Sequence, residues 1–448
     1  MREGVYMEGA EIIKEAYEDF ELMDAFRIVG YSLLGFFIFF IPIKINGYTN
    51  TVLYHIYYYI ENQYLSLVKL YILIMVCIGS VMPILNKSKE CNVFKNIYET
   101  IRPISILIII MIFTKSETSD SYNKDILFFI EDIILRTSIL FPLSCFFLPL
   151  ITKYGLLEVA EAYFNKYMKK TFKLSGKNIL NIMVYMMVDM FSGIFMTNQL
   201  YKEGKLRQVE ACTMVSCYAF TSLYISLYIL DEFSIKTKYT IILTNLILSL
   251  IINFILCRMW PLKNKKKSYI KKTSYKESNF KQDKFKKAIR QYMCNKEKKH
   301  LIFYMIQNFK DAFNIAMTII PNLIIIIFIG EIIINNTGII ETISLIINHF
   351  LELLKLPNKE LLSEFIILSI FNNIRAIDIV MDNIENITMY IIIFISTIQT
   401  VSLTTNIIYI DNTKIPISKS ELLVIGVEKI LLLISIVSIV YYLIMGYL

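Results

Sequence analysis

The segment that decides the fold runs from Lys177 to Tyr201 and reads KNILNIMVYMMVDMFSGIFMTNQLY. It is apolar enough to enter a lipid bilayer, but Asp189, Ser192 and Gly193 lie at its centre. An ionisable side chain at membrane depth costs roughly 2.5–3.5 kcal/mol on insertion scales, so it usually faces a cavity or a partner instead of lipid. Interrupted apolar segments are also typical of transporter binding sites. The segment therefore indicates a membrane protein with a polar site.

The composition is that of an all-α polytopic membrane protein. Of the 448 residues, 56% are hydrophobic, the mean hydropathy is +0.54, and several runs reach the roughly 20 apolar residues that cross a bilayer. The seven cysteines are scattered and the three histidines are isolated, which argues against a disulfide framework or a metal centre. The sequence has no phosphate-binding loop and no motif of a metalloprotease or serine hydrolase. We therefore expect neither a cofactor nor an enzyme.

Basic residues concentrate in one loop. The stretch 258–300 carries 16 Lys or Arg and three acidic residues, a net charge of +13 in a chain whose total is +8. The positive-inside rule places this loop in the cytoplasm. Because topology alone explains the charge, nucleic-acid binding is not expected. The chain then divides into an acidic cytoplasmic N-terminus (1–25), N-terminal transmembrane helices (26–151), a first unit (152–262), the basic loop (263–300) and a second unit (301–448).

Loop charges also place both ends of the opening segment in the cytoplasm. Lys177 precedes it, and Lys202, Lys205 and Arg207 follow it. If the segment crossed the membrane, the basic loops of this half would lie on opposite sides. The positive-inside rule therefore favours a re-entrant helical hairpin that turns near Asp189–Gly193. An amphipathic helix at about 152–177 is expected to lie on the cytoplasmic surface before it.

The other predicted spans of the first half are separated by short loops. A Tyr-rich loop that reaches about Gln63 is expected after the first span. The spans are expected at about 26–43, 65–85, 103–113, 126–151, 209–230 and 239–257.

The second half repeats the pattern of the first. Gly338-Ile-Ile-Glu341 echoes Gly155-Leu-Leu-Glu158 at an offset of 183 positions. In both halves a mixed apolar and polar helix, an interrupted apolar segment and a hydroxyl-rich span follow; the second interrupted segment is Leu361–Asp382. From Glu331 to Glu385 eight acidic residues stand against three basic ones, which suits the external face. We therefore predict about nine transmembrane helices plus two re-entrant helical hairpins, arranged as an inverted repeat.

An ordered series of short motifs resembles the YjiH family of bacterial membrane proteins. The series comprises Phe36–Asn46, Leu148-Pro-Leu, Tyr154–Glu158, Phe172–Gly176, Met196–Gly204, Glu210-Ala211, Arg258–Leu262 and Ile398–Ser418. It covers most of the chain from about residue 26. The resemblance implies a nucleoside-recognition or Gate domain, as in concentrative nucleoside transporters, ferrous-iron transporter B and spore-maturation proteins. The segment Phe371–Asp378 (FNNIRAID) is more charged than the family pattern.

A midplane site for a nucleoside needs carboxylates, amides and hydroxyls that face a cavity. We expect these groups in the two hairpins and in the two hydroxyl-rich spans. The first hairpin supplies Asp189, Ser192, Thr197, Asn198 and Gln199, and the second supplies Asn372, Asn373, Arg375 and Asp378. The spans supply Ser216, Thr221, Ser222, Ser396, Thr397, Gln399 and Thr400.

Each of these residues also has a structural interpretation. Asp189 is equally suited to pairing with a Lys or Arg from another helix. Arg375 and Asp378 lie three residues apart and are suited to pairing with each other. Hydroxyl groups within spans often bond to their own backbone. Glu428 and Lys429 in the last span are expected to form a self-neutralising pair.

Two functions from different classes fit these observations. The first is a secondary transporter in a bacterial inner membrane, which moves nucleosides or similar small polar solutes with Na⁺ or H⁺ as the coupling ion. The second is a non-transporting membrane scaffold or assembly factor, with the basic loop as its partner site. In both cases the lipid bilayer is a partner, and a homo-oligomer or a partner membrane protein is compatible with the sequence.

Overall fold

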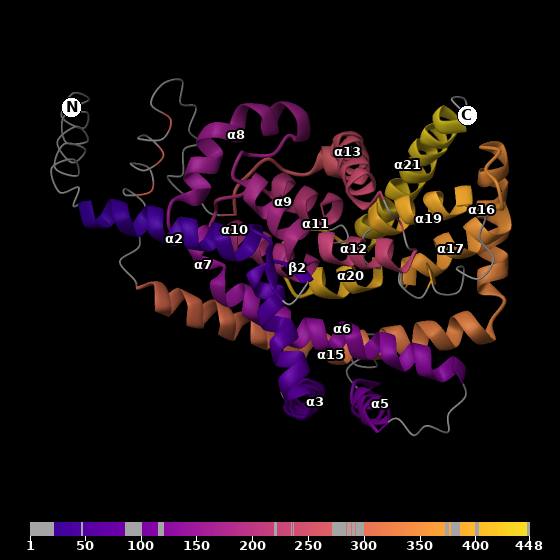
Figure 1. Cartoon of the computed structure of the whole chain (residues 1–448), viewed down its shortest axis with the longest axis horizontal. Coiled ribbons are helices and arrows are strands. Elements are labelled where there is room, and N and C mark those ends of the chain that lie inside the picture. The colour runs from indigo at the N-terminus through magenta and orange to yellow at the C-terminus, as the bar shows by residue number, and fades with distance from the viewer. Residues whose placement is uncertain are drawn as a thin grey trace.

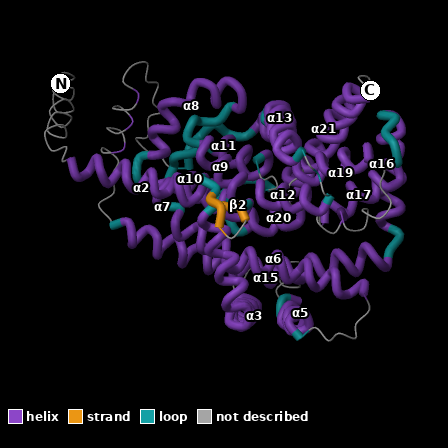
Figure 2. Tube along the Cα trace, viewed as in Figure 1, coloured by secondary structure: helices purple, strands orange, loops and turns teal. Residues whose placement is uncertain are grey.

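The computed structural model describes residues 22–45, 48–85, 101–114, 121–218, 222–233, 235, 237–270, 284, 288, 292, 300–371, 376–377, 386–398 and 403–445. Within these residues the protein is all-α apart from one small β-hairpin (Figures 1 and 2). The hairpin pairs β1 (Ile43–Ile45) with β2 (Tyr48–Asn50) and joins α2 (Leu22–Phe40) to α3 (Val52–Leu85). The predicted fold class is therefore confirmed at the level of an all-helical protein.

The expected Tyr-rich loop is helical. Helix α3 begins at Val52, and the only residue reported inside it with non-helical angles is Tyr64 (φ −127°, ψ 29°). Tyr54 and Tyr57, which are separated by almost one helical turn, are both buried. The tyrosines thus form the packed face of a helix, and the prediction of a loop was wrong because aromatic residues suit a helix–core contact as well as a membrane interface.

Two long helices from different halves of the chain lie side by side. Helix α6 (Ser121–Phe147) packs along α15 (Leu301–Asn336) (Figure 1). Helix α3 also packs on α15, so closely that a Cβ added to Gly79 would lie 1.9 Å from the carbonyl oxygen of Met317. Helix α5 (Ile104–Phe113) contacts both α3 and α15. The two halves of the sequence therefore share one packed core.

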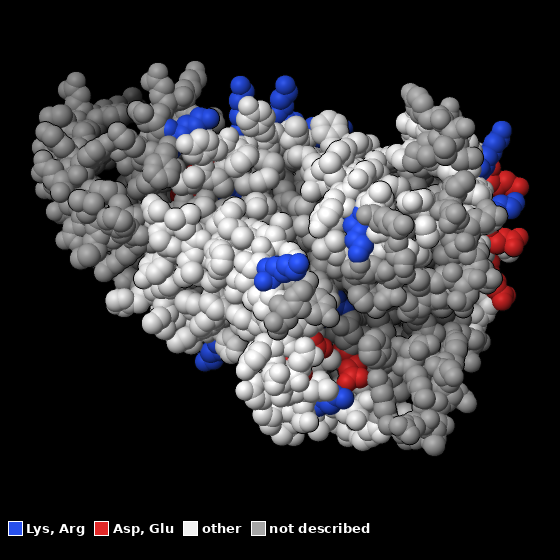
Figure 3. All heavy atoms as spheres, in the orientation of Figure 1, with Lys and Arg blue, Asp and Glu red and all other residues white. Residues whose placement is uncertain are grey.

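The first unit is built from short helices. After α7 (Pro149–Thr152) come α8 (Leu156–Phe172), α9 (Asn178–Met187) and α10 (Met190–Lys202). Helix α8 buries Glu158 and leaves Tyr167 70% exposed. Its buried face mixes apolar and acidic residues, its exposed face carries aromatic and Lys side chains, and Lys and Arg side chains gather along the edge over α8 (Figure 3). This arrangement suits the expected helix at the membrane surface.

The expected span at 209–230 is two helices. Helix α11 (Gln208–Cys217) ends before α12 (Leu223–Glu232) begins. Each has ten residues, which is about 15 Å of helix and half the thickness of a bilayer core. The prediction of one continuous span was wrong because apolar composition alone carries no signal for a break without Gly or Pro.

The second unit has a similar succession of short helices. Helix α16 (Ile339–Leu353) packs against α17 (Lys359–Phe371) at the edge of the molecule (Figure 1). The hydroxyl-rich region contains α19 (Asn386–Ile398) and α20 (Leu403–Asp411), and the residues between them lie outside the described residues. The residues that interrupt the predicted segment Leu361–Asp382, which are Asn372, Asn373, Arg375 and Asp378, lie outside the described residues.

Five of the described helices are long and apolar enough to cross a bilayer, so the protein is a multi-pass membrane protein. Two of them are α13 (Lys238–Leu256) and α21 (Lys419–Met445), which pack against each other and against α19. The qualifying segments are Val52–Met82, Ile133–Thr152, Lys238–Leu256, Leu301–Gly330 and Lys419–Leu443. The shorter apolar helices are Val29–Phe40, Ile104–Phe113, Asn178–Met187 and Thr388–Ile398.

Candidate functional site

Asp189 lies at the interruption that the sequence predicts. The backbone leaves the helical region at Val188 (φ −113°, ψ −91°) and is extended at Asp189 (φ −159°, ψ 168°), so α9 ends and α10 begins there. The Oδ1 atom of Asp189 accepts a hydrogen bond from the backbone N–H of Ser192 at 2.5 Å. A carboxylate at this position satisfies a free N–H group and interacts favourably with the helix dipole. The partly buried Asp189 is therefore the N-cap of α10.

Helices α9 and α10 pack antiparallel as a helical hairpin. Asn181 donates from Nδ2 to Thr197 Oγ1 at 2.7 Å. One turn nearer the tip, the ring of Tyr185 lies against Gly193, where an added Cβ would approach the ring to 2.5 Å. Residues at equal distances on either side of Asp189 thus face each other. Gly193 allows this contact because it has no side chain.

The base of the hairpin is held by one carboxylate. Glu210 of α11 accepts hydrogen bonds from the backbone N–H of Ser175, at 2.5 Å, and of Arg207, at 2.9 Å. Ser175 precedes α9 and Arg207 follows α10, so the two ends of the hairpin meet at Glu210. Hydrogen bonds to an ionised acceptor contribute about 1.5–3 kcal/mol each. Glu210 is fully buried and fixes this meeting point.

Charged groups surround this base. Burial lowers the pKa of Lys177, and the carboxylates of Glu161 and Glu210 oppose this effect. Burial by itself would raise the pKa of Glu203, but the ammonium groups of Lys205 and Lys153, at 2.9 and 2.8 Å, bring it below its ordinary value. The base is therefore a set of opposite charges in contact, in keeping with a membrane–water boundary.

A tyrosine from α3 connects the hairpin tip to the interruption between α11 and α12. The Tyr54 hydroxyl donates to the carbonyl oxygen of Val188 at 2.8 Å and lies 3.5 Å from Ser222 Oγ. Ser222 stands directly before α12. At the same tip, Ser192 hydrogen-bonds to Ser144 of α6. Two predicted site residues, Ser192 and Ser222, therefore belong to one polar group around the tip.

Aromatic rings enclose the other side of the tip. Phe141 of α6, Phe191 of α10 and Tyr409 of α20 lie with ring centroids 5.5–6.1 Å apart. The hydroxyl group of Tyr409 is buried and has no hydrogen-bond partner among the described residues. The Tyr409 hydroxyl can therefore donate or accept a further hydrogen bond, and the charge of Asp189 acts on this group.

Other predicted site residues have structural partners. Asn198 Oδ1 accepts from the backbone N–H of Lys414 at 3.0 Å, and Gln199 Nε2 donates to Asn308 Oδ1 at 2.9 Å. The hydroxyls of Ser216 and Ser396 donate to carbonyl groups of their own helices. Thr221, Asn372, Asn373, Arg375, Asp378, Gln399 and Thr400 lie outside the described residues.

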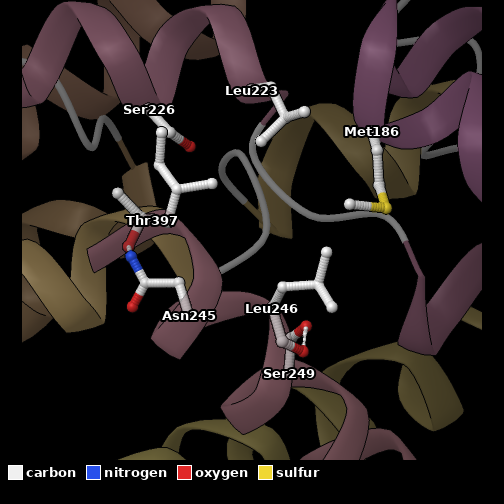
Figure 4. Close-up of a pocket in the computed structure, with 8 residues that line it drawn as sticks. Met186, Leu223, Ser226, Asn245, Leu246, Ser249 and Thr397 are labelled. Carbon is white, nitrogen blue, oxygen red and sulfur yellow. Dashed lines mark hydrogen bonds between the residues drawn. The ribbon is translucent and has the colours of Figure 1, made fainter. Parts of the chain in front are cut away.

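Thr397 lines a small cavity between the two halves (Figure 4). Its Oγ1 accepts from Asn245 Nδ2 of α13 at 2.6 Å. Ser226 of α12 and Met186 of α9 also line the cavity, which has a volume of about 30 Å³. That is room for about two water molecules. The cavity is therefore too small for a nucleoside in this conformation, although it brings the predicted hairpin and the hydroxyl-rich region together.

The expected pair of Glu428 and Lys429 is not formed. Lys429 is buried, and its Nζ donates to the carbonyl oxygen of Cys217 at 3.2 Å. Glu428 is partly exposed. Neighbouring residues of a helix point about 100° apart, so adjacency in sequence does not bring two side chains together. This prediction was therefore wrong.

Sequence reasoning missed Tyr54 and Ser144, and it assigned Lys429 the wrong partner. The signal for Tyr54 was the helical spacing of the tyrosines in 54–58, which we interpreted as a loop. A lone Ser such as Ser144 carries no signal within an apolar run. A single Lys within an apolar run was a signal for Lys429, because such a charge usually has a function. Among the described residues, no group of His, Cys, Asp or Glu is placed to hold a metal ion.

The chain is similar in sequence to one curated protein that the comparison found. A protein of Alkalihalophilus pseudofirmus, named Uncharacterized protein BpOF4_10220, is 21% identical to this chain over 298 residues. The match covers 65% of this chain and 64% of the relative, so it spans less than two thirds of the relative's length. No protein-family model matches the chain, and no solved structure matches it. The protein thus has a distant relative, and its resemblance to the YjiH family stays a prediction.

Proposed function

We propose that the protein is a secondary transporter of a bacterial inner membrane, which carries nucleosides or similar small polar solutes together with Na⁺ or H⁺. The observation that carries this proposal is the position of Asp189. It lies at the tip of a helical hairpin, where it caps α10 and forms no ion pair with a described residue, although the charge of Arg136 acts on it. A carboxylate that is not committed to an ion pair can accept hydrogen bonds from the hydroxyls of a sugar.

The base of the hairpin supports re-entry from one side of the membrane. Both of its ends contact Glu210, and charged groups surround this point. If the base lies at the membrane surface, α9 and α10 enter and leave on the same side. Non-helical backbone at the tip is then acceptable because it is surrounded by protein instead of lipid.

The second unit supports an inverted repeat and the resemblance to the Gate domain. Helices α16 and α17 form a helical pair, and α19 and α20 follow as two short helices, in the same order as the elements of the first unit. In transporters with such repeats, the ends of interrupted helices form the solute site near the midplane. We propose that the predicted residues of the second hairpin, which lie outside the described residues, also belong to this site.

Uptake into proteoliposomes tests the proposal. We expect purified protein to exchange radiolabelled uridine or adenosine across the membrane, and Asp189→Asn to abolish the exchange. The control is Asp411→Asn, because Asp411 is exposed and pairs with Lys419 at 2.9 Å. The absence of exchange for every nucleoside tested, in a folded preparation, would refute nucleoside transport.

The scaffold function is separated from transport by a deletion in the basic loop. The first part of the loop belongs to the fold, since Lys265 contacts Glu421 at 2.7 Å and the carbonyl oxygens of Lys266 and Ser268 accept hydrogen bonds from α11. The deletion should therefore begin after Ile270 and remove 271–283. A transporter retains solute exchange after this deletion, whereas a scaffold that binds its partner through the loop loses partner binding.

A further inference from the structure

Lys429 is a buried cation in the last long apolar helix. It lies in α21, ten residues after the helix begins at Lys419, and its side chain is 4% exposed. Its Nζ makes one hydrogen bond among the described residues, to the carbonyl oxygen of Cys217 at 3.2 Å. An ammonium group has three donors, so two are left without an acceptor among the described residues.

No acidic side chain is available to neutralise Lys429 among the described parts of the elements that pack against α21. Helices α13 and α19 contain no Asp or Glu. Glu210 of α11 is held by Arg207, and Asp411 of α20 pairs with Lys419. The titratable group that acts on Lys429 is the thiol of Cys217, and Cys257 and Glu428 act on that thiol in turn.

The acceptor of Lys429 is the end of a helix. Helix α11 ends at Cys217, where the last carbonyl groups lack partners within the helix and the helix dipole is negative. The helix end therefore stabilises the amino group of Lys429 while this group is protonated. If Lys429 loses its proton, the contact becomes an ordinary hydrogen bond and loses about half of its strength.

The segment between α11 and α12 links Lys429 to the hairpin tip. Its start, Cys217, accepts from Lys429, and its end, Ser222, lies next to Tyr54, which donates to Val188 beside Asp189. A change in the charge of Lys429 therefore acts on a segment whose other end contacts the tip. Residues 219–221, between these two ends, lie outside the described residues, so the link is the short stretch of chain that joins Cys217 to Ser222.

We propose that Lys429 binds the coupling proton, so that this transporter is driven by H⁺ and not by Na⁺. The proton binds to the neutral amine of Lys429 when the site faces one side of the membrane. It leaves the ammonium group for water when the site faces the other side. This proposal rests on the proposed transport function and specifies its coupling ion.

The test compares exchange with accumulation in the same proteoliposomes. We expect wild-type protein to accumulate labelled uridine under an imposed pH gradient in Na⁺-free buffer, and to gain nothing from a Na⁺ gradient at equal pH. Lys429→Met should retain uridine exchange and lose accumulation, because Met cannot bind a proton. Lys429→Arg should behave in the same way, because the guanidinium group of Arg stays charged and cannot release a proton. Lys419→Gln, an exposed lysine of the same helix, is the control and should accumulate uridine like the wild type.

Two results would overturn the proposal: accumulation by Lys429→Met under a pH gradient, or accumulation driven by Na⁺ alone. A wild type that exchanges no solute refutes the transport function instead. A solute-free measurement then decides about Lys429. Because the ammonium is costly in the membrane, we expect the melting temperature of the wild type to rise relative to that of Lys429→Met as pH increases. A difference that does not change with pH shows that Lys429 does not titrate and refutes its role.

Discussion

Asp189 and Lys429 are both charged residues within apolar segments, but their hydrogen-bond partners differ. Asp189 caps α10 and accepts from Ser192. Lys429 reaches one carbonyl group at the end of α11 and no described carboxylate. The carboxylate is thus held in place by its own helix, and the ammonium is held by a different helix. The difference suggests that Asp189 serves a fixed site, whereas the contact of Lys429 can change with its charge.

The largest expected effect comes from Asp189→Ala. It removes both the carboxylate that would accept from a solute and the N-cap of α10, whose loss costs about 1 kcal/mol. We expect exchange and accumulation to disappear while the protein stays folded. Labelled-uridine exchange in proteoliposomes and circular dichroism are the measurements. If Asp189→Ala loses only accumulation, as is expected for Lys429→Met, the distinction between the two residues is wrong.

Glu210→Gln should open the base of the hairpin. The amide keeps one acceptor but loses the charge-assisted bonds to Ser175 and Arg207, which should cost about 2 kcal/mol. Thermal unfolding of the detergent-solubilised protein measures this loss. Glu352→Gln is a matched control because Glu352 is exposed and pairs with Lys359 at the protein surface. Equal melting temperatures for the two variants would show that Glu210 does not hold the hairpin.

Gly193→Ala should separate the arms of the hairpin. The added methyl group would lie 2.5 Å from the ring of Tyr185, and such overpacking costs about 1–3 kcal/mol. We expect a lower melting temperature that is partly restored in the double variant Gly193→Ala with Tyr185→Leu. If the second substitution restores nothing, the close contact between the arms does not limit stability.

Tyr54→Phe has the smallest expected effect on stability and tests the link between the two charges. It removes the bond to Val188, worth about 1 kcal/mol, and keeps the ring. We expect exchange to continue and accumulation under a pH gradient to fall. Tyr71→Phe, which removes a similar bond to Ser138, is the control. Unchanged accumulation in Tyr54→Phe would show that the two sites are not coupled through this residue.

The two interruptions also differ in how well the sequence predicts them. The break at Asp189 was predictable because a carboxylate and a glycine lie together in an apolar run. The break between α11 and α12 was not, because the run from Val209 to Leu230 contains neither Gly nor Pro. Its partners, Lys429 and Tyr54, lie 212 and 168 residues away, and contacts at such separations are not part of the local pattern.

Local chemistry therefore determined the membrane class, the helical content and the hairpin at Lys177–Tyr201, because burial in lipid requires apolar runs whose backbone bonds stay within each helix. Only the tertiary structure decided that the base of the hairpin closes on Glu210, that the tyrosines of α3 are buried, and that Lys429 faces the end of α11. Those features depend on which side chains meet across the core. Periodicity shows the face that a helix buries, but not the partner that covers it.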